Sequence, residues 1–327
     1  MNEFNSDIFY LKNDNELFEQ YALKAFNYQF KYNNVYKEFV NYLKLNPEDI
    51  TSLNQIPFLP IQFFKSHRIS TKSSHHQLFT SSGTTGTQTS KHYVFDLKIY
   101  IESYLKAFQF FFGNIEDYCV LALLPSYLER EGSSLVFMVD DLIKKSKHNL
   151  SSFYIHEIDD LIKAIDCLKK QNQKTILLGV SYALLDLAEK NITLNDDFFV
   201  METGGMKGKR KEMVKQELHE ILKNAFGVST IYSEYGMTEL LSQAYSKADC
   251  IYETPPWMKI LISEVTDTRY FIENGKSGII NIIDLANWYS CPFLATQDLG
   301  KKIGINKFEI LGRLDNSDIR GCNLLIQ

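Results

Sequence analysis

The chain contains 327 residues, 45% of them hydrophobic and 13% aromatic, which is enough apolar material for the core of one large domain. A formal net charge of -5 at pH 7 provides no basic surface field, and this disfavours nucleic acid or an anionic membrane as a partner. The five cysteines are scattered and include no Cys-x-x-Cys pair, so neither a disulfide framework nor a zinc cluster is indicated. The apolar runs are far shorter than the roughly 20 residues that cross a bilayer, and the N-terminus does not resemble a signal peptide, so we expect a cytoplasmic protein without a membrane span.

The first part of the chain has a helical pattern. Between Phe18 and Leu43, aromatic and aliphatic residues recur at spacings of three and four, which predicts two amphipathic helices. A proline-containing segment at 56–67 then interrupts the pattern. We therefore expect an N-terminal helical segment at 1–50, followed by a large domain at 51–327.

The middle of the chain alternates short β-rich runs with helical ones, which predicts a mostly parallel sheet flanked by helices on both faces. From Trp257 onward the runs are β-rich and separated by turn residues, which predicts antiparallel C-terminal strands. The fold class is therefore α/β. The alternating pairs are 118–124 with 133–145, 151–155 with 159–170, 175–180 with 183–190 and 197–203 with 209–226, and the later runs are 258–265, 269–273, 278–285 and 307–314.

The most informative segment is an unbroken run of eight Ser, Thr or Gly residues at 80–87. Glycines let backbone N–H groups approach an anion, and hydroxyl groups donate to phosphate oxygens without adding bulk. The run indicates a flexible loop that binds a triphosphate, although the spacing is not that of a Walker loop. Composition alone would also fit an ordinary Ser/Thr-rich turn.

Four segments in order resemble the signature motifs of the adenylate-forming (acyl-CoA synthetase-like) superfamily. The similarity implies the fold of the large N-terminal domain of these enzymes, with ATP as a substrate. The segments are the loop Ser81, Ser82, Gly83, Thr84, Thr85, Gly86 and Thr87; the Y-G-x-T-E motif of Tyr235, Gly236, Thr238 and Glu239; a degenerate T-G-D motif ending in Asp298; and the G-R-x-D hinge with Arg313 and Asp315.

The Y-G-x-T-E segment has a chemical rationale that agrees with the resemblance. Glu239 offers a hard oxygen ligand for a Mg²⁺ ion that bridges phosphate oxygens. Thr238 is suited to donate to the α-phosphate, and Tyr235 offers a flat ring face to adenine. Each residue type alone has a commoner explanation, since a single Glu is usually a solvated charge and Tyr-Gly is usually a turn.

The remaining residues of the nucleotide site are implied by the resemblance. Asp298 is expected at the ribose hydroxyls, with Arg313 assisting from the hinge. Gly204 and Gly205 follow a predicted strand and would let the backbone approach adenine. Taken alone, a Gly-Gly pair is usually a loop.

The C-terminal part of the sequence indicates one family within the superfamily. Only 12 residues (327 - 315) follow Asp315, so we expect the large domain without the small mobile C-terminal domain of acyl-CoA synthetases. Together with the segment at 56–67, this resembles the acyl-protein synthetase family of bacterial bioluminescence. The family implies ATP and Mg²⁺, a fatty acid or other carboxylic acid, and an acyl carrier protein, reductase or acyltransferase as partner.

Cys322 matches the family's cysteine that carries the acyl group as a thioester. Arg320 nearby would favour the thiolate, which is the attacking species. The alternative is a small apolar residue packing at a strand end, the commonest fate of a lone cysteine.

The sequence departs from the superfamily pattern at two places, which weakens the expectation of a lysine contact to phosphate and of a complete T-G-D motif. Gln88 and Thr89 stand where the loop usually continues with Pro-Lys, and Lys91 follows two positions later. Gln297 replaces the glycine of T-G-D, which leaves Asp298 as the matching residue of that motif.

Two other functions remain open from the sequence. An α/β-hydrolase-type acyltransferase is one, because Gly179, Ser181 and Ala183 lie between a strand and a helix as in a nucleophile elbow, although the second glycine is missing and His219 is the only downstream histidine. A non-catalytic subunit that binds a nucleotide and docks a partner is the other.

Overall fold

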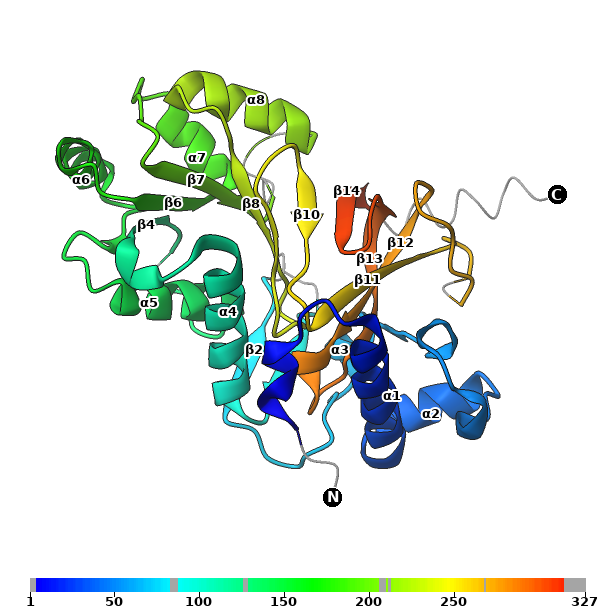
Figure 1. The fold of residues 1–327 in the computed structure, drawn as a ribbon. Helices are drawn as coiled ribbons and strands as arrows, with labels where there is room; N and C mark the ends of the chain where they lie inside the picture. Colours follow the sequence, from blue (N-terminus) through cyan, green and yellow to red (C-terminus); the bar gives the residue numbers. More distant parts are fainter. Residues whose placement is uncertain are drawn as a thin grey trace.

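A computed structural model describes residues 4–82, 88–125, 129–205, 210, 213–267 and 269–314. In this part of the chain, most strands join one 12-stranded sheet with the order β11-β12-β13-β14-β10-β9-β8-β7-β6-β4-β5, and β1 pairs with β13 (Figure 1). A separate hairpin, β2–β3, lies apart from the large sheet. The α/β class with antiparallel C-terminal strands is confirmed.

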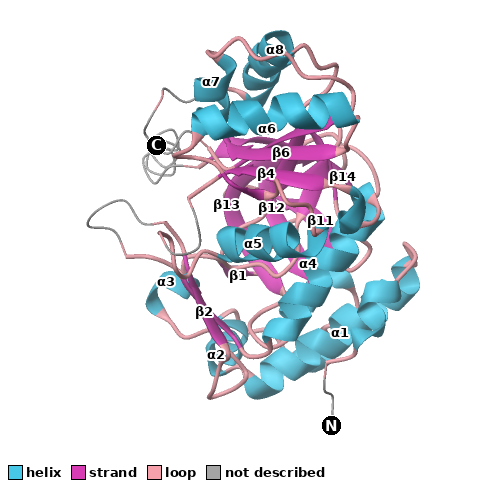
Figure 2. Cartoon of the chain, turned by 90° about the vertical axis from the view of Figure 1, so that its left-hand side faces the viewer, coloured by secondary structure: helices cyan, strands magenta, loops and turns pink. Residues whose placement is uncertain are grey.

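The first half of the large sheet is parallel. Its strands are buried on both sides, because α4 and α5 cover one face while α6, α7 and α8 cover the other (Figure 2). All four predicted strand and helix pairs are present. The elements are α4 (Leu97–Phe112), β4 (Cys119–Leu123), α5 (Ser134–Ser146), β5 (Ser152–Phe153), α6 (Ile158–Gln171), β6 (Thr175–Val180), α7 (Ser181–Ala188), β7 (Phe198–Thr203), α8 (Lys215–Phe226) and β8 (Tyr232–Tyr235).

The second half of the sheet is antiparallel and begins where β9 pairs with β8. The predicted strand at 269–273 is wrong, since this segment makes one isolated bridge, from Phe271 to Ser263, at the sheet edge. In sequence this segment lies between β11 and β12. Because these two strands pair with each other, the segment can pair only along the outer side of β11. The strands are β9 (Ala244–Ser246), β10 (Ile251–Glu253), β11 (Met258–Ser263), β12 (Ser277–Asp284), β13 (Phe293–Lys302) and β14 (Lys307–Arg313).

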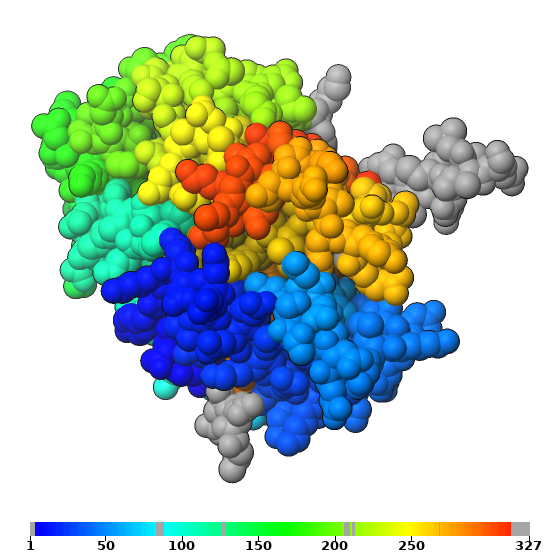
Figure 3. All heavy atoms as spheres, turned by 45° about the vertical axis from the view of Figure 1, so that its right-hand side comes forward, coloured from blue at the N-terminus to red at the C-terminus, as the bar shows by residue number. Residues whose placement is uncertain are grey.

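The N-terminal helices pack against the C-terminal strands, and Figure 3 shows these two ends of the chain side by side on the surface. The two predicted helices are confirmed as α1 (Asn15–Tyr32) and α2 (Asn34–Tyr42). Gln29 donates to the carbonyl of Trp288 at 2.6 Å, and Asn33 donates to the carbonyl of Ser290 at 2.8 Å. The boundary between 1–50 and 51–327 stays a prediction.

Four short elements connect the helices α1 and α2 to the large sheet. Strand β1 pairs with β13 in parallel. Strands β2 and β3 form an antiparallel hairpin, and the hydroxyl-rich loop connects them in sequence. No described helix combines the length and the apolar character needed to cross a bilayer. The elements are β1 (Leu59–Pro60), α3 (Phe63–Ser66), β2 (Gln77–Thr80) and β3 (Lys91–Val94).

Candidate functional site

Hydrogen bonds between β2 and β3 fix the two positions that flank the hydroxyl-rich loop. Thr80 and Lys91 are partners in the β2–β3 ladder. Beyond them, the N–H of Ser81 donates to the carbonyl of Ser90 at 3.1 Å, and the N–H of Ser90 donates to Ser81 Oγ at 2.9 Å. Ser82 follows and is exposed. The other predicted loop residues, Gly83, Thr84, Thr85, Gly86 and Thr87, lie outside the described residues.

Glu239 lies in the loop at 236–243, where the chain turns from the last parallel strand into the first antiparallel one. This is the kind of switch point, at the carboxyl ends of parallel strands, where α/β sheets bind ligands. The side chain of Glu239 is 7% exposed. Burial raises its pKa, whereas a hydrogen bond from Ser90 and the charges of Arg313 and Lys65 oppose that rise. A buried carboxylate with partial charge compensation fits the binding of a cation.

Two backbone carbonyls of this loop are fixed by a buried network. His92 Nδ1 contacts the carbonyl of Thr238 at 2.7 Å, and His92 Nε2 contacts Ser290 Oγ at 2.8 Å. Ser290 Oγ donates to Asn287 Oδ1 at 2.6 Å, and Asn287 Nδ2 donates to the carbonyl of Glu239 at 2.6 Å. Burial lowers the pKa of His92 to about 4, so the imidazole is neutral at pH 7. The network therefore orients Thr238 and Glu239.

The following turn is held by Asp284. Its carboxylate accepts from the N–H groups of Leu241 and Ser242 at 2.9 and 3.0 Å, and from Ser242 Oγ at 2.6 Å. Sequence reasoning missed Asp284, His92, Ser290 and Asn287. His92 could have been found, because it lies just after the hydroxyl-rich loop in sequence. Nothing in the sequence relates the other three residues to the loop at 236–243.

Tyr235, Asp298 and Arg313, three of the residues that the sequence motifs select, lie close together. The hydroxyl of Tyr235 donates to Asp298 Oδ2 at 2.7 Å, and Arg313 Nε lies 3.9 Å from Asp298 Oδ1. Asp298 and Arg313 are direct partners across β13 and β14. Burial raises the pKa of Asp298, opposed by the Tyr235 hydrogen bond and the Arg313 charge. The Asp298 side chain is 17% exposed and that of Arg313 is 67% exposed, so both are accessible from the surface.

Gly204 and Gly205 follow β7 directly. Gly204 has a φ of 71°, in the left-handed region that favours glycine, and its carbonyl accepts from Ser181 Oγ at 3.4 Å. Gly236, after β8, is needed for space, because a Cβ there would lie 2.4 Å from Glu234 Oε1. The two predicted glycine sites therefore lie at the ends of neighbouring strands.

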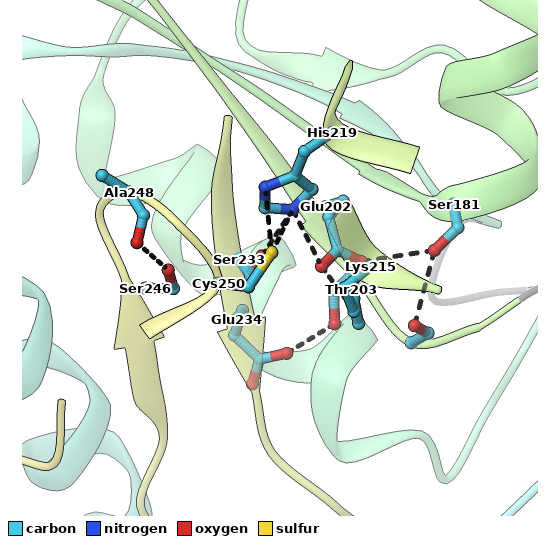
Figure 4. Close-up of polar contacts among 11 residues, drawn as sticks. Ser181, Glu202, Thr203, Lys215, His219, Ser233, Glu234, Ser246, Ala248 and Cys250 are labelled. Atoms are coloured by element: carbon cyan, nitrogen blue, oxygen red, sulfur yellow. Dashed lines mark hydrogen bonds and ion pairs between the residues drawn. The ribbon is translucent and has the colours of Figure 1, made fainter. Parts of the chain in front are cut away.

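Ser181 is not arranged as a nucleophile. It is 1% exposed, and its hydroxyl donates to Glu202 Oε2 at 3.2 Å rather than to an imidazole (Figure 4). A strained nucleophile elbow requires a positive φ at the nucleophile. Ser181 is not among the described non-glycine residues that have a positive φ. His219 instead contacts Ser233 Oγ at 3.1 Å and Cys250 Sγ at 3.4 Å. The hydrolase interpretation has no support in this geometry.

Glu202 is the centre of a buried polar cluster beneath the Gly204 turn. Lys215 donates to Oε1 of Glu202, and Ser181 links Glu202 to the Gly204 carbonyl (Figure 4). Burial raises the pKa of Glu202, but Lys215 and His219 outweigh it and hold the pKa below its ordinary value. The cluster fixes the turn from below, on the face of the sheet that α7 and α8 cover.

An apolar cavity lies on the opposite face, between the sheet and the helices α4 and α5. Its walls are apolar except for the Tyr245 hydroxyl, and the space is about the size of one water molecule, too small for an acyl chain. The cavity is lined by Phe108, Val120, Met138, Val139, Leu142, Ile176, Leu178, Met201 and Tyr245.

Residues 4–125 match a family model described as acyl-protein synthetase, LuxE. The matched part contains the N-terminal helices, the β2–β3 hairpin and the strand β4. Comparison with curated protein sequences finds no match. The resemblance to acyl-protein synthetases predicted from the sequence is therefore confirmed over residues 4–125.

Solved structures with the same fold include ATP-bound MatB from Rhodopseudomonas palustris, with 15% identity, a TM-score of 0.55, and coverage of 72% of this chain and 47% of that one. The chain thus spans about half the length of MatB. An open conformation of 2-hydroxyisobutyryl-CoA ligase in complex with 2-HIB-AMP and CoA has 12% identity, a TM-score of 0.67, and coverage of 92% and 70%. The same ligase in the thioesterification state has 13% identity, a TM-score of 0.65, and coverage of 92% and 68%. The chain has the fold of the large domain of adenylate-forming enzymes.

Proposed function

Because residues 4–125 match the acyl-protein synthetase family and the fold is that of adenylate-forming enzymes, we propose that this chain activates a carboxylic acid with ATP and passes the acyl group to a thiol. One observation carries the proposal. Ser90, at the end of the hydroxyl-rich loop, and Arg313 both act on Glu239, and Arg313 and Tyr235 both lie against Asp298, although these residues come from distant parts of the sequence.

The proposed first step forms an acyl-adenylate. A carboxylate oxygen of the acid attacks the α-phosphorus of ATP, and pyrophosphate leaves with the electron pair of the broken P–O bond. Hydroxyl and N–H donors of the loop from Ser81 onward would stabilise the leaving group, with Thr238 at the α-phosphate. Asp298 would accept from the ribose hydroxyls while Arg313 keeps it ionised.

Glu239 is the residue that would hold Mg²⁺. No cluster of three or more His, Cys, Asp or Glu side chains suited to a metal occurs in the described part of the chain, so phosphate oxygens and water would complete the coordination. When bound, the ion would neutralise charge on the phosphates.

The proposed second step transfers the acyl group. A thiolate attacks the acyl carbon, a C–S bond forms, and AMP leaves with the electrons of the C–O bond. The thiol is that of Cys322, beside Arg320, or one on an acyl carrier protein, reductase or acyltransferase partner. Cys322 and Arg320 lie outside the described residues. The resemblance to acyl-protein synthetases supports a fatty acid as the acid, and we place the reaction in the cytoplasm.

The first test is ATP–pyrophosphate exchange by the isolated chain across a series of carboxylic acids. We expect acid-dependent exchange in the native protein, and a loss of at least a hundredfold in Glu239→Gln, because the amide has no charge for the cation. Glu273→Gln is the matched control, since Glu273 is 84% exposed. Full exchange in Glu239→Gln would remove Glu239 from the mechanism. No exchange with any acid would favour the non-catalytic docking subunit instead.

The acceptor thiol has a separate test with a radiolabelled acid. Cys322→Ser should retain exchange but lose acyl label on the protein, since a hydroxyl is a far weaker nucleophile than a thiolate. Cys167→Ser is the control, because Cys167 is a partly exposed free cysteine. Label that persists in Cys322→Ser would place the acceptor elsewhere.

A further inference from the structure

The proline-containing segment at 56–67 is a feature of the sequence that the proposed mechanism does not use. Its strand β1 pairs with β13, and the N–H of Ile61 then donates to the carbonyl of Ala295 at 2.9 Å. Ala295 lies three residues before Asp298 on the same strand. The helix α3, which follows β1 closely, therefore begins next to the strand that carries Asp298.

The buried side of α3 packs against the residues that support Glu239. Phe64 is fully buried, and its ring meets the ring of His92 edge-on, with the ring centroids 5.6 Å apart. His92 Nδ1 in turn contacts the carbonyl of Thr238, the residue before Glu239. The helix is thus held by β13 on one side and by β3 on the other, beside the loop at 236–243.

Lys65 follows Phe64 in this helix and is exposed. Its charge, like that of Arg313, acts on the carboxylate of Glu239. Arg313 already has an acidic partner, since its Nε lies 3.9 Å from Asp298 Oδ1. For the Lys65 side chain, no hydrogen bond or ion pair occurs within the part of the chain that the structure describes. Its ammonium group is therefore available to an anion that binds beside Glu239.

The hydroxyl-rich loop provides no cation of its own. Residues 80–89 include neither Lys nor Arg. The next cation in sequence, Lys91, lies between Ser90 and His92, whose side chains both reach the loop at 236–243. Because side chains alternate along a strand, Lys91 points to the opposite side of the hairpin. A triphosphate bound by the loop carries more negative charge than one Mg²⁺ neutralises, so a cation from another segment would stabilise it.

We propose that Lys65 binds the β- or γ-phosphate of ATP, the part of the nucleotide that leaves as pyrophosphate. The inference rests on the proposed function and deepens it, because it assigns a phosphate-binding residue to the segment at 56–67. A lysine ammonium binds phosphate oxygens as a point charge. At this position it would stabilise the negative charge that develops on the leaving group.

The test measures the binding of ATP with Mg²⁺ and of AMP by titration calorimetry, without an acid. In Lys65→Gln, the Kd of ATP should rise by about ten- to a hundredfold, the loss expected for a hydrogen bond to a charged group. The Kd of AMP should not change, because AMP has no β- or γ-phosphate. In ATP–pyrophosphate exchange, the KM for pyrophosphate should rise together with the Kd of ATP. Lys65→Arg keeps the positive charge and should lose less in both measurements.

Lys170→Gln is the matched control, since Lys170 is an exposed lysine in the last turn of α6. A role of Lys65 in the packing of α3 alone would weaken ATP and AMP together. If Lys65→Gln weakens AMP as much as ATP, leaves both unchanged, or leaves the KM for pyrophosphate unchanged, the assignment of Lys65 is refuted while the proposed function stands. If the native chain binds neither nucleotide, the proposed function fails and the inference with it.

Discussion

Asp298 joins a residue of the Y-G-x-T-E motif to a residue of the hinge, through the Tyr235 hydroxyl and the Arg313 guanidinium. If it accepts from the ribose, Asp298→Ala removes a hydrogen bond to a charged group, about 1.5–3 kcal/mol, so KM for ATP should rise by about ten- to a hundredfold. The measurement is exchange as a function of ATP concentration at saturating acid. Asp196→Ala, at an exposed position, is the control, and an unchanged KM in Asp298→Ala would contradict the assignment.

Glu234 makes a prediction about pH. Burial raises its pKa to about 7, from 4.5 in a model peptide. The folded state therefore favours the protonated form, so this contribution to stability is complete below pH 4.5 and is lost as the pH rises through 7. Relative to Glu234→Gln, which stays neutral, the native chain should lose roughly 3 kcal/mol of unfolding free energy between pH 4.5 and 8. Urea unfolding at both pH values measures this difference, and a constant difference would refute the shift.

At the residue scale, the sequence motifs selected residues that lie close together in the structure, and their roles stay predictions. Tyr235, Asp298 and Arg313 were selected by motif, and the structure brings them together. Sequence reasoning failed for His92 and Glu234, because a buried histidine and a buried acid acquire meaning only from neighbours that a linear pattern does not reveal.

At the scale of elements, the loop at 236–243 depends on groups that other segments contribute. Asn287 donates to the carbonyl of Glu239, so Asn287→Ala leaves that buried carbonyl without its partner. We expect a loss of about 1–3 kcal/mol in unfolding free energy, together with a fall in exchange at saturating ATP. Urea unfolding and kcat measure the two effects. Asn54→Ala, at an exposed position, should change neither, and an unaltered kcat in Asn287→Ala would show that the network does not orient Glu239.

The sequence pattern predicted the longer elements better than the short ones. The strand and helix pairs from Tyr118 to Phe226 have continuous apolar runs and clear helical periods, and all of them form. The strands β9 and β10 have three residues each, too few to establish a period of two. The sequence pattern does not predict the hairpin β2–β3 either, since its strands have four residues each.

At the scale of the whole molecule, the N-terminal helix α1 is connected to the loop at 236–243 through one chain of contacts. Gln29 and Asn33 donate to the carbonyls of Trp288 and Ser290, and the Ser290 hydroxyl contacts His92, which in turn holds the loop. The contacts of Gln29 and Asn33 join residues 259 and 257 positions apart in sequence. Helical periodicity predicted α1 but not its partner, because the partner is a pair of backbone carbonyls.

This chain of contacts predicts that α1 is required for a stable site. Gln29→Leu preserves the size of the buried side chain but leaves the Trp288 carbonyl without its donor, so unfolding free energy should fall by about 1–3 kcal/mol. Exchange activity should fall as well, since Trp288 lies two residues before Ser290 in the segment that supports His92. Gln20→Leu, at an exposed position of the same helix, is the matched control. If Gln29→Leu lowers stability but leaves kcat unchanged, α1 supports the core without influencing the site; if it changes neither, the contact contributes nothing, and the helices at 1–50 behave as a separate unit.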